Sequence, residues 1–190
     1  MRTWRFITIL FTALSMAMAF CHLLEMPTRM SFDGRLWITT QALYRLFGPP
    51  LGAIIEGGAV ITTVILAFLV RQRRPAFWWT LTGAACIVMA HVIWWIFINP
   101  VNAEISTWTP DTVPADWMRY RSQWEYTHAA RAVLQIIGLS ALVLSVLLEI
   151  PRGHSRDRTM VSIRPSDSTA SATLRTGWRN GLKHHQQNPL

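Results

Sequence analysis

Four long apolar runs, separated by shorter polar segments, dominate the hydropathy pattern of this chain. They cover about residues 5–26, 50–70, 77–98 and 126–148. Each run has the roughly 20 residues that a helix needs to cross a bilayer. The pattern therefore predicts an all-α fold, an integral membrane four-helix bundle formed by residues 1–150.

The segments between the runs predict where the helices end and how they meet. Pro27 is expected to end the first helix. Residues 35–47, RLWITTQALYRLF, form a short amphipathic segment, which is typical of an interfacial helix. Ala53 and Gly57 form a small-xxx-small pair, which predicts a close helix approach there.

Polar and aromatic side chains recur at helical spacing near two of the runs. Positions three or four apart lie on one helix face, so each set forms a stripe. The first stripe, at the entrance to the fourth run, consists of Trp117, Arg121, Trp124, His128 and Arg131. The second, at the end of the third run, consists of His91, Trp95, Asn99 and Asn102.

Ionisable residues within the runs are placed so that they meet at one end of the bundle. Successive spans run in opposite directions, so the end of one span lies beside the start of the next. The residues concerned are His22, Glu25, Glu56, His91, Glu125, His128 and Arg131. Because unpaired burial would cost several kcal/mol each, the sequence predicts a polar site that draws on all four spans.

Composition and charge support a membrane protein and argue against nucleic-acid binding. Charged residues make up 15% of the chain, below the roughly 25% of soluble domains. The net charge is +8, but residues 151–190 hold seven of the 18 basic residues and only two acidic ones. We expect this basic segment to be a disordered cytoplasmic tail. Cys21 and Cys86 should lie at different depths, so no disulfide is expected.

The distribution of basic residues also predicts topology. Arg71, Arg73 and Arg74 lie between the second and third runs, whereas the third connection has acidic residues and no Lys or Arg. The positive-inside rule then places both termini in the cytoplasm of a multi-pass cell-membrane protein. The site would open on the extracytoplasmic side. Arg29, Arg35 and Arg45 in the first connection are the exceptions to this assignment.

Three sequence segments resemble a known family. They are YRLFGPPLGAIIEGGAV, NPVNAEISTW, and the pattern W-x3-R-x2-WE-x2-H-x2-R that opens the fourth span. Together with the four spans, they are similar to the anthrone oxygenase-like family of small membrane proteins, most of whose members are a domain of unknown function. The resemblance covers about residues 5–150. It implies family positions at Asn99, Asn102, Trp108, Trp117, Arg121, Trp124, His128 and Arg131.

The resemblance implies an oxygenase or oxidase that acts on a lipid-soluble, anthrone-like aromatic substrate with dioxygen and without a cofactor. His128 would be the base, oriented by Glu125, and Arg121 or Arg131 would stabilise the developing oxyanion. The expected substrate-binding residues are Trp95, Asn99, Asn102, Trp108, Trp117 and Trp124, with the tryptophans stacking on the planar rings.

Two alternatives remain open at this point. The first is an iron or haem site, because Glu125-x-x-His128 has the spacing of di-iron bundles and two facing histidines can ligate haem. Its ligands would come from His22, Glu25, Glu56, His91, Glu125 and His128. The second alternative is a binding, transport or accessory module without chemistry. The sequence predicts neither the substrate nor the oligomeric state.

Overall fold

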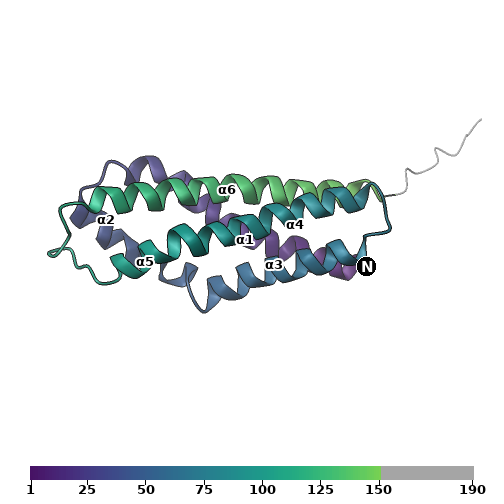
Figure 1. The fold of residues 1–190 in the computed structure, drawn as a ribbon, viewed down its shortest axis with the longest axis horizontal. Helices are drawn as coiled ribbons and strands as arrows, with labels where there is room; N and C mark the ends of the chain where they lie inside the picture. The colour runs from purple at the N-terminus through teal and green to yellow at the C-terminus, as the bar shows by residue number, and fades with distance from the viewer. Residues whose placement is uncertain (151–190) are drawn as a thin grey trace, which may run out of the picture. The chain divides into compact units, whose positions relative to one another are not determined.

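The structure, a computed structural model, describes residues 1–150, and it confirms the all-helical four-span architecture. Four helical segments are long and apolar enough to cross a membrane. They are α1 (Arg2–Arg29), α3 (Leu51–Leu69), the continuous run of α4 (Ala76–Ile93), η2 (Trp94–Ile98) and α5 (Asn99–Ile105), and α6 (Trp117–Leu147). They lie side by side as an elongated bundle (Figure 1). The predicted disordered tail, residues 151–190, lies outside the described residues.

The first connection differs from expectation in one respect. Pro27 does not end α1, which continues to Arg29 with the proline in its last turn. Two short helices follow, α2 (Gly34–Thr40) and the 3-10 helix η1 (Gln41–Phe47). The side chain of Asp33 accepts a hydrogen bond from the Leu36 backbone N–H and so caps α2.

The η1 helix is amphipathic, as the sequence predicts. Leu43 and Leu46 are exposed on one side, whereas Tyr44 and Phe47 are partly buried on the other. The exposed leucines suit a lipid-facing surface. The partly buried rings point towards the bundle, so η1 separates the interior of this end from its surroundings.

Close packing in the bundle depends on small residues, but not on the predicted pair. A Cβ added at Gly57 would have open space around it, so the expected close approach at Ala53 and Gly57 is wrong. Instead, α4 and α6 pack tightly at Gly83, where an added Cβ would lie 2.8 Å from the Leu142 Cγ atom and 3.0 Å from the Gly138 carbonyl oxygen. Packing between transmembrane helices commonly uses such small residues.

A single turn of π-helix interrupts the third span. The η2 segment begins at Trp94, just before Pro100, whose ring nitrogen cannot donate a hydrogen bond. A π turn adds a residue to the helix and therefore rotates the positions that follow it. As a result, His91 and Trp95 do not share one face with Asn102, and the predicted second stripe is broken.

The end of the bundle away from the N-terminus carries α2, η1, α5 and the start of α6 (Figure 1). The core at this end contains large aromatic and aliphatic side chains, in contrast to the small residues between α4 and α6. Trp37, Ile38, Ile98, Val101 and Trp124 are buried there, in contact with further partly buried rings. This aromatic core surrounds the predicted polar site.

Candidate functional site

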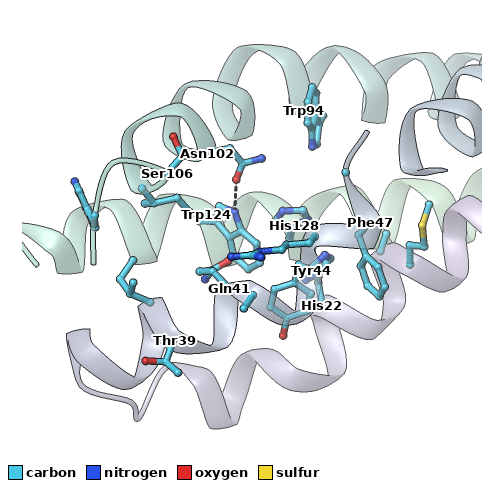
Figure 2. Close-up of a pocket in the computed structure, with 18 of the residues that line it drawn as sticks. His22, Thr39, Gln41, Tyr44, Phe47, Trp94, Asn102, Ser106, Trp124 and His128 are labelled. Atoms are coloured by element: carbon cyan, nitrogen blue, oxygen red, sulfur yellow. Dashed lines mark hydrogen bonds between the residues drawn. The ribbon is translucent and has the colours of Figure 1, made fainter. Parts of the chain in front are cut away.

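A cavity of about 570 Å³ lies at the aromatic end of the bundle. Its walls combine aromatic rings from η1, η2 and α6 with polar and charged side chains from α1, α3, α5 and α6. Figure 2 shows Tyr44, Trp124, His22 and His128 gathered at its centre. The rings that line it are Tyr44, Phe47, Trp94, Trp108 and Trp124, and the polar groups include His22, Gln41, Glu56, Asn102, His128 and Arg131.

Two buried histidines face each other in this cavity. The rings of His22 and His128 have centroids 4.1 Å apart, and the Trp124 ring lies 4.2 Å from that of His128. The Trp124 indole N–H donates a 2.9 Å hydrogen bond to the Asn102 side-chain oxygen, which fixes the tryptophan (Figure 2). Among residues 1–150, the buried Nδ1 atom of His128 has no hydrogen-bond partner. A buried polar atom of this kind is costly unless a ligand or proton transfer uses it.

Arg29 and Glu125 form a buried ion pair beside the histidines. Arg29 Nη2 lies 2.7 Å from Glu125 Oε2, and the two residues are only 3% and 1% exposed. Trp37 Nε1 donates a second hydrogen bond to Glu125, at 3.1 Å. The Arg29 guanidinium also lies 4.8 Å from the centroids of the Tyr44 and Trp124 rings. The pair therefore joins the end of α1 to α6 and orders two rings of the cavity wall.

A second ion pair lies between α3 and α6. Arg131 Nη2 is 2.7 Å from Glu56 Oε1, and Arg131 Nε donates to the Ala90 carbonyl oxygen. The Nδ1 atom of His91 lies 3.6 Å from the other Glu56 oxygen. Both Arg131 and Glu56 line the cavity. Pairing compensates these charges, which explains how a bundle within a membrane accommodates them.

Tyr44 links the cavity to the outside of the bundle. Its hydroxyl donates a hydrogen bond to Glu25, whose side chain is 41% exposed. Burial, together with this hydrogen bond, raises the pKa of the Tyr44 phenol above its ordinary value. Glu25 also accepts a hydrogen bond from Arg29 at 3.3 Å.

Half of the predicted catalytic and substrate-binding residues line the cavity. These are Asn102, Trp108, Trp124, His128 and Arg131. Trp117 and Glu125 lie behind the wall, where Trp117 packs against Trp37. The roles assigned to all of these residues stay predictions.

Three predicted site residues lie elsewhere. Trp95 is 57% exposed and donates a hydrogen bond to His91, because the π turn directs Trp94 rather than Trp95 to the cavity. Asn99 is partly buried and not part of the lining. Arg121 donates to the Phe32 carbonyl oxygen and lies over the Trp117 ring, so it holds the first connection against α6.

The predicted pairing of Glu125 with His128 is also wrong. Both carboxylate oxygens of Glu125 are engaged by Arg29 and Trp37. The immediate neighbours of the His128 ring are His22 and Trp124. Glu125 and His128 are three positions apart on α6, so both face the interior of the bundle. They nevertheless contact different partners.

The six residues of the metal alternative do not form one cluster. Glu25 and Glu125 bind Arg29, Glu56 binds Arg131, and the rings of His22 and His128 contact each other directly. Within residues 1–150, three or more His, Cys, Asp or Glu side chains nowhere come together in a group that could hold a metal ion. A metal site would require these ion pairs to rearrange.

Sequence reasoning missed four residues that shape the site, Arg29, Tyr44, Phe47 and Trp94. Arg29 follows His22 by seven positions and Glu25 by four, so it shares their helix face once α1 is allowed to pass Pro27. The period-three placement of Tyr44 and Phe47 opposite Leu43 and Leu46 indicated a buried side of η1. Trp94 had no signal in the sequence, since its direction depends on the π turn.

Comparison with known proteins supports the resemblance. Residues 50–141 match the model of a family described as anthrone oxygenase. The match covers α3 to most of α6, including Glu56, Asn102, Trp124, His128 and Arg131, and it agrees with the family that the sequence resembles. No curated protein and no solved structure matches the chain.

Proposed function

We propose that this chain, whose residues 50–141 match the anthrone oxygenase family model, oxidises a planar, lipid-soluble aromatic substrate with dioxygen in the cavity at the end of the bundle. The proposal is carried by two features that occur together. They are an aromatic wall and the buried imidazole of His128, whose Nδ1 atom has no hydrogen-bond partner in the described part of the chain. The cavity volume, about 570 Å³, falls within the range of small-molecule sites.

The aromatic wall accounts for binding. Rings of Tyr44, Phe47, Trp94 and Trp124 border the cavity, and stacked or edge-to-face contacts with a fused ring system are favourable. Trp124 is held by both Asn102 and the Arg29 guanidinium, so its orientation is set before substrate arrives. Such preorganisation lowers the entropy cost of binding.

Proton abstraction would start the reaction. The methylene carbon of an anthrone is acidic, because its carbanion is delocalised into the ketone and the two rings. His128, in its neutral form, takes one proton from this carbon. Arg131 supplies a fixed positive charge for the negative oxygen of the resulting enolate. The imidazole of His22, in contact with that of His128, keeps the base in place.

Dioxygen then oxidises the carbanion. The carbon gives up an electron pair to form a C–O bond, and the reduced oxygen becomes a peroxide anion that takes up a proton. His128, once it has released the first proton to water, takes the second proton from the same carbon. The O–O bond then breaks and leaves a ketone, and the leaving hydroxide takes up a proton to form water. All electrons come from the substrate, so the scheme requires no further reductant. We propose, in keeping with the family resemblance, that it requires no cofactor.

We also propose that both termini face the cytoplasm and that the cavity opens on the other side of the cell membrane. Two of the three arginines that oppose this orientation have local partners. Arg29 is buried against Glu125, and Arg35 lies 2.9 Å from Asp111. Labelling of single cysteines introduced at Thr109 and Arg73 in intact cells would test the orientation, with reaction expected only at position 109.

The proposed reaction is tested by oxygen uptake with an anthrone. Purified protein in detergent should accelerate uptake and anthraquinone formation above the spontaneous rate. His128→Ala should lose about 10²-fold or more in kcat while still binding substrate. His91→Ala, a histidine outside the cavity lining, is the matched control and should retain turnover. Equal rates with and without native protein would contradict the proposal.

Metal analysis of the same preparation separates the competing function. Stoichiometric iron or a haem absorption band that disappears in His128→Ala would contradict the cofactor-free scheme. It would favour the Glu and His ligand set considered from the sequence. A preparation with neither, but with turnover, would support the scheme proposed here.

A further inference from the structure

The oxidation scheme requires protons to move into a buried cavity. A proton leaves the substrate carbon at one stage, and the peroxide and hydroxide oxygens take up protons at later stages. His128 acts in this scheme as the base at both abstractions, so a second group at the cavity wall that donates protons to the reduced oxygen would leave His128 free for that role. A connection between that donor and the surface of the bundle would replace the proton that it gives up.

Tyr44 and Glu25 form such a connection. The Tyr44 ring lines the cavity, with its centroid 4.6 Å from that of His22 and 5.8 Å from that of Trp124. Its hydroxyl hydrogen-bonds to Glu25, and the Glu25 side chain reaches the surface of the bundle. A phenol that borders the reacting space on one side and a solvent-accessible carboxylate on the other is a two-step path for a proton.

We propose that Tyr44 donates the proton to the peroxide oxygen and that Glu25 returns a proton to Tyr44 from water. In this step the Tyr44 O–H bond breaks and a peroxide O–H bond forms. The Glu25 carboxylate then takes up a proton from water and passes it to the phenolate, so that both groups return to their starting forms. Electrons are not transferred. The inference rests on the proposed function, because it assigns the proton source for that reaction.

The charged surroundings suit this role. The Arg29 guanidinium lies 4.8 Å from the centroid of the Tyr44 ring and would stabilise a transient phenolate. The other titratable groups that face Tyr44 are His22 and Glu25 from α1 and, across the cavity, His128 from α6. The raised pKa of Tyr44 keeps the phenol protonated, and thus ready to donate, between turnovers.

The test compares Tyr44→Phe, Glu25→Gln and the double variant in the oxygen-uptake assay. Phe keeps the ring in the cavity wall, and Gln keeps an acceptor for Tyr44 and Arg29. We expect Tyr44→Phe to lower kcat by about 10²-fold with little change in KM. Glu25→Gln should lower kcat as well, and the double variant should be no slower than Tyr44→Phe, because both residues serve one step. Tyr126→Phe, on an exposed position of α6, is the control.

Two further readouts separate proton donation from a structural role. The kcat of the native protein should fall in D₂O, and small acids such as imidazolium should partly restore turnover in Tyr44→Phe. Additive losses in the double variant, or full activity of Tyr44→Phe, would overturn the inference while leaving the proposed function intact. A native protein without anthrone-dependent oxygen uptake would overturn both.

Discussion

The buried ion pair between Arg29 and Glu125 offers the sharpest test of how the site is held together. Glu125→Ala would leave the Arg29 charge buried and would remove the acceptor of Trp37 Nε1. Removing one member of a buried ion pair costs about 3–5 kcal/mol. Glu25 remains 3.3 Å from Arg29 and offsets part of the loss, so we expect a destabilisation of about 3 kcal/mol.

The chain contains a matched control for this substitution. Arg35 and Asp111 approach to 2.9 Å, but their side chains are 69% and 72% exposed. Exposed pairs of this kind contribute about 0–1 kcal/mol. A destabilisation of 1 kcal/mol lowers the Tm by about 2–4 °C in a protein of this size. Glu125→Ala should therefore lower the Tm by roughly 6–12 °C and Asp111→Ala by at most a few degrees.

Thermal unfolding in detergent, followed by circular dichroism, provides the assay. The double variant Arg29→Met with Glu125→Ala should recover part of the Tm, because it no longer contains an uncompensated buried charge. Similar Tm losses for Glu125→Ala and Asp111→Ala would refute the reasoning. A double variant less stable than Glu125→Ala alone would also contradict it.

Two further predictions follow from local geometry. The fold favours the protonated form of Tyr44, so its contribution to stability is present below about pH 10 and is lost as the pH rises through the raised pKa of the folded state. The measurement is the difference spectrum between native protein and Tyr44→Phe at about pH 11. It should show no phenolate absorbance when the protein is folded and clear phenolate absorbance when it is unfolded. Phenolate in the folded protein at that pH would contradict this prediction. Gly83→Ala should destabilise the bundle by about 1–3 kcal/mol, because the new methyl group meets Leu142 and the Gly138 carbonyl. Gly57→Ala should be neutral or stabilising, because its methyl group has open space. Equal effects of the two substitutions on the Tm would contradict the difference in packing between the two sites.

Hydropathy predicts the architecture well because the bilayer imposes a length and a polarity on each span. The inward direction of Trp124, His128 and Arg131 also followed from their spacing, since one uninterrupted helix preserves a stripe. The stripe predicted from His91 to Asn102 is not formed, because the helix that carries it is interrupted. A π turn before Pro100 changes the helix period, and no simple hydrophobic pattern records that change.

The partners of charged residues were harder to predict than their location. Glu125 was expected to bind His128, a neighbour on its own helix, but its partner Arg29 lies 96 positions earlier in the chain. Pro27 predicts that the helix ends before Arg29 and leaves it in a connecting loop, whereas α1 includes Arg29. Long-range pairing depends on how α1 and α6 pack, and only the three-dimensional arrangement defines it.

The most direct test of the proposed function is the fate of dioxygen. Purified protein in detergent would be given an anthrone under ¹⁸O₂, beside a protein-free reaction and His128→Ala, and the anthraquinone analysed by mass spectrometry. The account predicts that native protein accelerates anthraquinone formation and that the new ketone oxygen is ¹⁸O. In the His128→Ala sample, the rate of anthraquinone formation should fall close to the protein-free rate. Product that forms no faster with native protein, or that takes its new oxygen from water, would contradict the account.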